Sequence, residues 1–341
     1  MKSSSVALPN SIVMNKVNDY YGIDVSKDTL DVAGGENVHL VFTNDLNGFK
    51  ELLKWSGSDV HFVMETTGVY HQRLAHFLHS KSCKVSVVNA LVIHRYSQML
   101  LRSTKTDKAD AKMIMSYAIT NAADLKLWEP LPAYIQSCKD ISGTINLLLK
   151  QRTSLKNRRH SLKAKDASKT KLSRSIEKSI KSLNTEIDVL ETMMEELIVE
   201  HEGVLFDQLK SIPGIGPKTA MFLIVVTNGF RTFDSSKQVS SFLGMSPSLK
   251  MSGSSIRGQS RITKTGNKHM RKLLFLCSFT AYKYNPACKD LYDRITDKGK
   301  SEKLALIAVG NKLIKQAFAI AKSGEYFDPE FVSVNPALNV K

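Results

Sequence analysis

The chain has 341 residues, a length typical of two or three domains, and its 48 Lys and Arg outnumber its 32 Asp and Glu, for a formal net charge of +16. Such a surplus favours a polyanionic partner, above all nucleic acid. The sequence shows no apolar run long enough to cross a bilayer, no signal-peptide core, and no CxxC pair among its cysteines, which are Cys83, Cys138, Cys277 and Cys288. We therefore predict a cytoplasmic protein with reduced thiols, no membrane partner and no metal–thiolate site.

Residues 20–125 alternate between strand and helix patterns. Three short apolar stretches, YYGIDVS, TLDVAGG and VHLVFTND, follow one another with turn residues between them, close enough to form hairpins. Helical spacing in LNGFKELLKWSG, GVYHQRLAHFLHSKS and DKADAKMIMSYAITNA then alternates with the strand patterns VHFVMET and KVSVVNA. This order predicts an α/β region built on a mixed sheet with helices on its faces, and it places His71, His76 and His79 on one helix.

After Pro130 and Pro132 the pattern becomes helical, from residue 134 to about residue 200. Apolar residues recur at alternating steps of four and three, as in a heptad seam: Ile176, Ile180, Leu183, Ile187, Leu190, Met194 and Leu197. A preceding helix carries a similar stripe, and the polar segment KAKDASKTKLS separates the two. The pattern predicts a long helical hairpin or coiled coil, packed on itself or on a second subunit.

Two regions of the chain are strongly basic. Residues 150–181 hold twelve Lys and Arg, including Arg158 and Arg159, against Asp166 and Glu177. A charged run is most often a solvated helix face, but one so one-signed favours contact with nucleic acid. Between Asp234 and Asp290 there are ten Lys and Arg and no acidic residue, which predicts a second electropositive surface in a mostly helical third region.

The segment LKSIPGIGPKTA, residues 209–220, fits a helix–hairpin–helix pattern. Gly214 and Gly216 would form the tight turn, whose amide groups at a helix N-terminus bind a phosphate oxygen regardless of base sequence. Lys218 adds a positive charge to this predicted phosphate contact. A simple turn between two helices is the alternative interpretation.

Carboxylates interrupt two of the predicted strands. Asp24 ends one apolar run and Glu65 ends another, where a charge is costly unless something pairs with it. Asp107 and Asp110 lie three residues apart at a predicted helix start, and so share one helix face. If these carboxylates converge they need cations, for which Mg²⁺, as one or two ions, is the natural choice. Two such ions would suit phosphoryl transfer.

Some of these acidic residues also have simpler interpretations. Asp107 could be the helix N-cap, and Asp110 could stabilise the helix dipole. Asp28 and Asp31 are predicted to be turn and surface residues. Asp24 and Glu65 both lie in apolar strands, and local structure explains them less easily.

The segment LKMSGSSIRGQSRITKTGNKHMRK, residues 249–272, combines serines, glycines and basic residues. A serine hydroxyl could attack a phosphodiester here, with Arg257 and Arg261 stabilising the charge of the transition state. A flexible Ser/Gly loop that binds phosphate is the alternative, and the residues alone favour it. In either case these arginines and Lys264 are predicted nucleic-acid contacts.

Six motifs, in order along residues 20–325, resemble those of the DEDD transposases of the insertion-sequence-110 family, which includes the Piv-type DNA invertases. They include GIDVSKDTLDV, METTGVY, KTDKADA, IPGIGPKTA and FLGMSPSLKMSGSSIRGQSRITKTGN. The resemblance implies an N-terminal extension (residues 1–18), a RuvC-like domain of the RNase H fold (19–130), a basic coiled coil or helical hairpin (131–203), a C-terminal transposase domain (204–330) and a tail (331–341).

The resemblance also implies roles for individual residues. Asp24, Glu65, Asp107 and Asp110 correspond to the acidic tetrad that holds Mg²⁺, and Ser252 corresponds to the nucleophile, with Ser254 and Ser255 as neighbouring alternatives. Family members are bacterial and act on double-stranded DNA, in transposition or inversion, as dimers or tetramers with composite active sites. Many are guided by a non-coding RNA.

We therefore expect a site-specific DNA recombinase that acts near the nucleoid. The alternative enzyme is a metal-dependent, junction-resolving nuclease, which would use the tetrad and water in place of Ser252. A third possibility is a DNA- or RNA-binding protein without catalytic activity, in which the carboxylates are structural.

Overall fold

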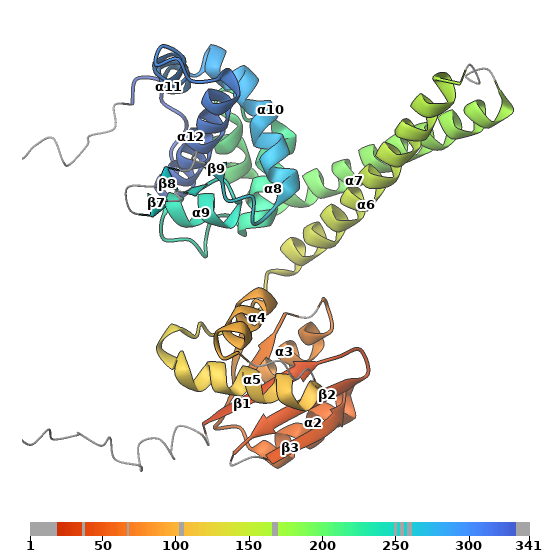
Figure 1. Ribbon diagram of the computed structural model, residues 1–341, viewed down its shortest axis with the longest axis vertical. Helices are drawn as coiled ribbons and strands as arrows, with labels where there is room; N and C mark the ends of the chain where they lie inside the picture. The colour runs from red at the N-terminus through yellow and green to blue at the C-terminus, as the bar shows by residue number, and fades with distance from the viewer. Residues whose placement is uncertain are drawn as a thin grey trace, which may run out of the picture. The chain divides into compact units, whose positions relative to one another are not determined.

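A computed structural model describes residues 19–35, 38–66, 68–101, 106–165, 170–248, 251–252, 256–257 and 261–331 (Figure 1). The extension predicted for residues 1–18 lies outside the described residues, as does the tail beyond residue 331. The chain divides into two compact units, residues 1–130 and residues 131–341.

The N-terminal unit is built on a five-stranded sheet with the order β3-β2-β1-β4-β5. The first three strands are antiparallel neighbours, and β4 and β5 run parallel to β1, so the predicted mixed sheet is confirmed. A tight turn joins β1 to β2, in which the Ser26 amide donates to the Thr29 carbonyl at 2.9 Å. The strands are β1 (Tyr20–Val25), β2 (Thr29–Gly34), β3 (Val38–Thr43), β4 (His61–Glu65) and β5 (Lys84–Val88).

Helices cover both faces of this sheet, because strands such as β1 and β4 are apolar on both sides. On one face α2 (Leu46–Ser56) and α3 (His71–Ser80) pack on Ile23, Leu30 and Phe62, and α3 carries the three predicted helical histidines. On the other face α4 (Ala90–Met99) and α5 (Asp107–Thr120) pack on Val63. A short 3-10 turn, η1 (Ala122–Asp124), follows α5.

Helix α5 lies unusually close to β1. A Cβ atom placed on Gly22 would overlap with the carbonyl oxygen of Ala111 and the amide nitrogen of Met115. Ala111, which is fully buried, is the small residue on the helix side of this contact. The glycine therefore lets the helix backbone rest directly on the strand, which holds the first turn of α5 near the end of β1.

The second unit begins with two long helices, α6 (Ala133–Lys163) and α7 (Lys171–Lys210), which pack along each other as a hairpin (Figure 1). The predicted stripe on α7 is the packed face, since Ile176, Ile180, Ile187 and Met194 are buried. Whether the packing follows coiled-coil geometry stays a prediction. The hairpin shares its core with the helices that follow, through Ile145, Ile198 and Phe206.

The rest of the second unit is mostly helical, as predicted. Its helices are α8 (Pro217–Thr227), α9 (Ser236–Phe242), α10 (Lys268–Tyr284), α11 (Pro286–Thr296) and α12 (Glu302–Ser323). Two small ladders lie between α9 and α10: β6 (Pro247–Ser248) with β9 (Arg261–Ile262), and β7 (Met251–Ser252) with β8 (Ile256–Arg257).

Helix α12 corrects one expectation. Among the described helices it alone is long and apolar enough, by length and composition, to cross a membrane, whereas no such run was expected. Its residues Val309, Leu313, Ile314 and Ala317 are nevertheless fully buried in the core of the second unit. One face of the helix is thus apolar because it packs against neighbouring helices in the core of the unit.

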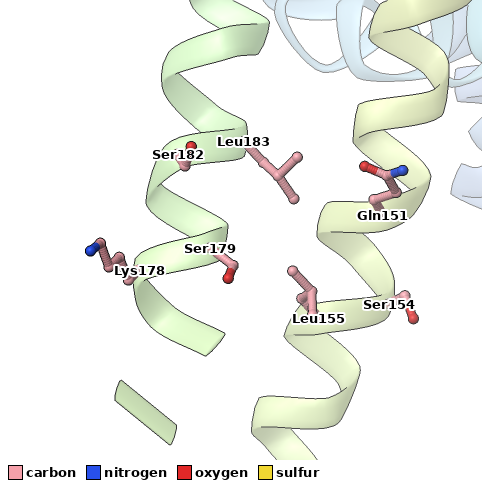
Figure 2. Close-up of a pocket in the computed structure, with 7 residues that line it drawn as sticks. All are labelled: Gln151, Ser154, Leu155, Lys178, Ser179, Ser182 and Leu183. Carbon is pink, nitrogen blue, oxygen red and sulfur yellow. The ribbon is translucent and has the colours of Figure 1, made fainter. Parts of the chain in front are cut away.

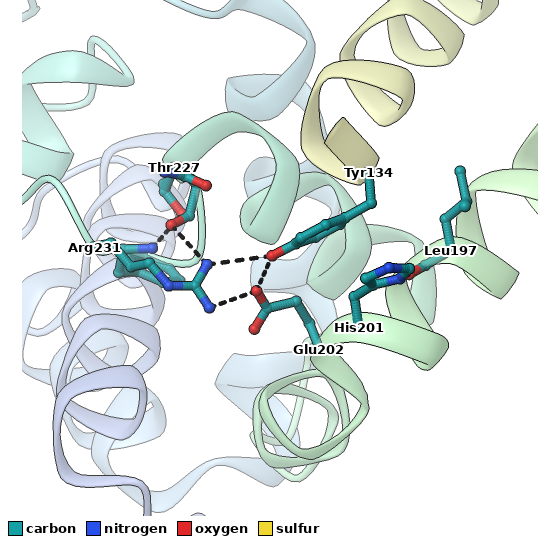
Figure 3. A network of polar contacts seen from close by, with 8 residues as sticks. Tyr134, Leu197, His201, Glu202, Thr227 and Arg231 are labelled. Carbon is teal, nitrogen blue, oxygen red and sulfur yellow. Dashed lines mark hydrogen bonds and ion pairs between the residues drawn. The ribbon is translucent and has the colours of Figure 1, made fainter. Parts of the chain in front are cut away.

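A polar network around the buried Glu202 ties the hairpin to the rest of its unit (Figure 3). Glu202 has non-helical backbone angles, φ −134° and ψ 26°, and kinks α7. Its buried carboxylate accepts hydrogen bonds from the Tyr134 hydroxyl at the start of α6 and from Nη2 of Arg231, after α8, at 2.5 Å. The Tyr134 ring in turn stacks on His201, with ring centroids 4.4 Å apart. Three separate segments therefore meet at one buried charge.

We predict that Gly22→Ala destabilises the N-terminal unit by about 1–3 kcal/mol, because the added methyl group overlaps with the backbone of α5 and forces the helix off the strand. Chemical denaturation followed by circular dichroism would measure this. Gly143→Ala is the control: an added Cβ meets nothing within 4 Å, so alanine should be neutral or stabilising in this helix interior. Equal stability of the two variants would contradict the close contact.

Candidate active site

The sheet brings the ends of two apolar strands together. Asp24 is the penultimate residue of β1, and Glu65 is the last residue of β4. The two strands are parallel, and Ile23 pairs with Met64, so Asp24 and Glu65 are the next residues in register. Both carboxylates are partly buried at the same edge of the sheet.

The other two carboxylates come from the first turn of α5. Thr106 is the N-cap of this helix, and its hydroxyl accepts from the Ala109 amide at 3.2 Å. The N-cap interpretation of Asp107 is therefore wrong: Asp107 is the first helical residue, and Asp110 lies on the same face, one turn further along. Because α5 rests on Gly22, this turn reaches Asp24, two residues further along β1.

The structure brings three of the four predicted residues into one cluster. Asp24, Asp107 and Asp110 each offer a carboxylate oxygen, and these oxygens lie within 4.8 Å of one another. Glu65 is not part of this set, but its charge acts on Asp24. We call these four residues the acidic cluster.

Charge and burial act together on Asp24. Burial raises the pKa of its carboxyl to about 6, assisted by the negative charges of Glu65, Asp110 and Asp107 and, more weakly, of Asp31. Each of these influences disfavours the ionised form. In the absence of a cation, Asp24 is therefore partly protonated near pH 6.

The donor set of the acidic cluster fits Mg²⁺. All of its ligand atoms are carboxylate oxygens, which a hard divalent cation prefers, and their mutual repulsion is relieved when a cation binds between them. The cluster contains no thiolate or imidazole that would favour a softer metal.

Asp31 is a correction to the sequence analysis, which placed it at the surface. It lies in β2, is 8% exposed, and is the direct cross-strand partner of Asp24. His39 of β3 approaches it, with Nε2 2.8 Å from Oδ1 of the aspartate. Asp28, in the turn, is exposed as expected. The turn length could have revealed the error, because a turn that pairs Ser26 with Thr29 also pairs Asp24 with Asp31.

The serine segment belongs to the other unit. Ser252 lies in β7, where it pairs with Ile256 of β8, and the backbone alone is described there. The same holds for Arg257 and Arg261, which lie in β8 and β9. Ser254 and Ser255 lie outside the described residues. Lys264 is exposed and adopts a left-handed backbone, with φ 59°.

The predicted hairpin turn joins α7 to α8. Gly214 has φ 108°, and a Cβ there would lie 2.7 Å from that of Ala281, so this glycine packs against α10. Gly216 is the exposed N-cap of α8 and has open space beside it. Lys218 makes an ion pair with Glu191 of α7. Of the predicted phosphate contacts, Gly216 is the more accessible glycine.

The basic part of the hairpin contains a shallow groove of about 660 Å³ between α6 and α7. Figure 2 shows Leu155 and Leu183 directed into the space between the helices, whereas Lys178 points away from it. Near this end of the hairpin, Arg158 is exposed, and Nη1 of Arg159 lies 3.0 Å from the Glu177 carboxylate. The apolar residues thus face inward and leave the charges on the outside.

Known protein families match both units of the chain. Residues 21–162 match the model of a DEDD transposase family, and residues 207–293 match that of the transposase IS116/IS110/IS902 family. The chain is 33% identical to the pilin gene-inverting protein of Moraxella bovis over 330 residues, which cover 91% of this chain and 97% of that protein. The corresponding protein of Moraxella lacunata is 33% identical over 327 residues, with the same coverage.

A third relative comes from an insertion element. It is the insertion element IS110 uncharacterized 43.6 kDa protein of Streptomyces coelicolor, 29% identical over 154 residues, or 45% of this chain and 37% of that protein. The family models cover both the acidic cluster and the hairpin turn, and the pilin gene-inverting proteins align along nearly their whole length. The chain therefore belongs to the IS110 family of DEDD transposases, enzymes that recombine DNA.

Proposed function

We propose that this protein is a site-specific DNA recombinase in which the acidic cluster holds Mg²⁺ and Ser252 is the nucleophile. The observation that carries the proposal is the convergence of the Asp24, Asp107 and Asp110 oxygens within 4.8 Å, in a chain of a DNA-recombining family. The strand order β3-β2-β1-β4-β5 supports assigning the N-terminal unit to the RuvC-like branch of the RNase H fold.

In the proposed reaction, the Ser252 hydroxyl oxygen attacks a phosphorus atom of the DNA backbone and gives up its proton to solvent. The bond from phosphorus to the 3′ oxygen breaks, and that oxygen takes up a proton from solvent, which leaves a free 3′ hydroxyl and a 5′-phosphoserine link. Attack by the 3′ hydroxyl of another strand reverses these steps, rejoins the DNA and releases the serine. When bound, Mg²⁺ neutralises charge on the phosphate. Asp24, Asp107 and Asp110, with Glu65 beside them, would hold the cation.

The relatives bear on the outcome of the reaction. Alignment with 97% of the pilin gene-inverting proteins supports inversion of a DNA segment, whereas the family models support transposition. Both outcomes need the same cleavage and rejoining, so the proposed chemistry does not depend on the choice.

We further propose that nucleic acid binds the basic part of the hairpin. The surplus of Lys and Arg over residues 150–181 supports this. We propose two further contacts, the exposed N-cap Gly216 and the basic segment that contains Arg257, Arg261 and Lys264. Together these regions would bind double-stranded DNA and a guide RNA. We also propose that the protein acts as a dimer or tetramer near the nucleoid.

We predict that Ser252→Ala abolishes covalent protein–DNA adducts, because alanine has no hydroxyl oxygen to attack phosphorus. The substrate would be a plasmid carrying the DNA that flanks the gene, incubated with Mg²⁺, denatured and analysed on a gel. Ser254→Ala and Ser255→Ala are the matched controls and should still form adducts. Adducts in the Ser252 variant would exclude this nucleophile. If wild type cuts the DNA but forms no adduct, the junction-resolving nuclease is favoured.

We predict that Asp110→Asn lowers the rate of DNA cleavage by more than the roughly 10- to 100-fold typical of outer-sphere residues, because it removes one of three converging ligands. DNA binding, measured by fluorescence anisotropy, should be unchanged. Asp28→Asn removes an exposed carboxylate from the same unit and should cleave normally. Normal cleavage by the Asp110 variant would instead indicate a structural role for the carboxylates.

We predict a pH-dependent stability difference between wild type and Asp24→Asn in metal-free protein. The folded-state pKa of Asp24 is about 6, above its ordinary 3.8. Ionisation of Asp24 therefore lowers the stability of the fold progressively as the pH rises from 3.8 to about 6, and the full destabilisation is present above pH 6. The neutral variant should therefore be more stable at pH 8 by about 1–3 kcal/mol, with the difference disappearing toward pH 4. Urea denaturation at both pH values would measure it, and a less stable variant at pH 8 would contradict the raised pKa.

A further inference from the structure

We propose that Asp31, held by His39, is a positioning residue for the acidic cluster: it lies outside the three converging oxygens, and its carboxylate beside Asp24 raises the affinity for a divalent cation. This inference rests on the proposed function. It assigns a role to two residues, one on β2 and one on β3, that the tetrad does not include.

Strand register places Asp31 beside the cluster. Asp24 and Asp31 are direct partners in the antiparallel pair of β1 and β2. Cross-strand partners have Cβ atoms roughly 4.5–5.5 Å apart and project from the same face of the sheet. The two aspartates are therefore neighbours, although seven positions separate them in the chain.

The face they share is the one covered by α5. Gly22 precedes Asp24 by two residues, so both project to the same side, and a side chain at Gly22 would run into α5. Helix α5 packs against β2 as well as β1. Asp31 thus lies beneath the helix whose first turn supplies Asp107 and Asp110.

His39 fixes the Asp31 carboxylate. Most of β3 is exposed, but the His39 side chain is only 15% exposed, and its Nε2 lies 2.8 Å from Oδ1 of Asp31. The contact is diagonal, since His39 pairs with Ala33 while Asp31 pairs with Val41. A carboxylate that is hydrogen-bonded through one oxygen keeps its orientation, and its second oxygen can still accept a hydrogen bond.

A purely structural role explains the hydrogen bond between β2 and β3 but not the position of the charge. Val or Thr would suit a buried strand better, and a fourth aspartate beside three others adds repulsion. When a cation occupies the cluster, the Asp31 carboxylate attracts the cation, and this attraction outweighs the repulsion. Groups that surround a metal's ligands commonly change its affinity by about 10- to 100-fold.

Binding of Mn²⁺ to the full-length protein, without DNA, tests this directly. Electron paramagnetic resonance counts free Mn²⁺ and gives a dissociation constant that does not depend on catalysis. We expect Asp31→Asn to weaken Mn²⁺ binding by about 10-fold or more, and Asp31→Glu, which keeps the charge, to weaken it less. Asp28→Asn, an exposed residue of the same hairpin, should bind as wild type does.

The histidine provides a second comparison that leaves the Asp31 side chain in place. His39→Phe keeps a ring but removes the hydrogen bond, and we expect it to weaken Mn²⁺ binding several-fold. His39→Gln retains an amide donor and should recover part of that loss. If Asp31→Asn does not fold, the His39 variants and Asp31→Glu still decide the matter.

The two proposals fail in distinguishable ways. If wild type binds Mn²⁺ and Asp24→Asn abolishes binding, but folded Asp31→Asn or both His39 variants bind as wild type does, the positioning role is wrong and the proposed function stands. If wild type itself does not bind Mn²⁺, or Asp24→Asn binds it normally, the proposed function fails, and the positioning role with it.

Discussion

Repulsion among carboxylates at the end of β1 is the constraint on which the N-terminal unit depends. Asp24, Asp107 and Asp110 bring oxygens within 4.8 Å of one another, and like charges so close separate unless the backbone prevents it. The fold prevents it in two ways. Strand β1 is fixed between β2 and β4, and α5 rests so closely on Gly22 that its first turn cannot withdraw without disrupting the buried contacts of Ile114.

The folding free energy of the unit therefore offsets the repulsion among these charges. The raised pKa of Asp24 reflects this repulsion, since burial and neighbouring charges both oppose its ionisation. A cation that enters such a cluster finds its ligands already in place and relieves the repulsion. The hydrophobic core opposes the repulsion as well, because apolar packing of α5 on Val63 holds the helix in place although Asp107 and Asp110 are repelled by Asp24.

Much of this site could be predicted from the sequence because its pattern is local. Alternation identified the strand that ends at Glu65 and the strand that contains Asp24, which continues one residue beyond the predicted end to Val25. The spacing of Asp107 and Asp110 placed them on one helix face. Contacts between distant segments were not accessible in the same way. Nothing local to Gly22 indicates that α5 lies on it. The turn length pairs Asp31 with Asp24, but the burial of Asp31 depends on β3 and α5. The apolar length of α12 was missed, and its burial depends on surrounding helices.

On the proposed assignment, the basic and acidic parts of the chain act on DNA over different distances. The Lys and Arg of residues 150–181 attract a polyanion from afar, and salt screens this attraction. The acidic cluster repels a phosphate only at close range, where burial leaves the repulsion poorly screened. DNA can therefore associate with the protein before any cation is bound, but a phosphodiester can approach Asp24 only after a cation has neutralised the cluster.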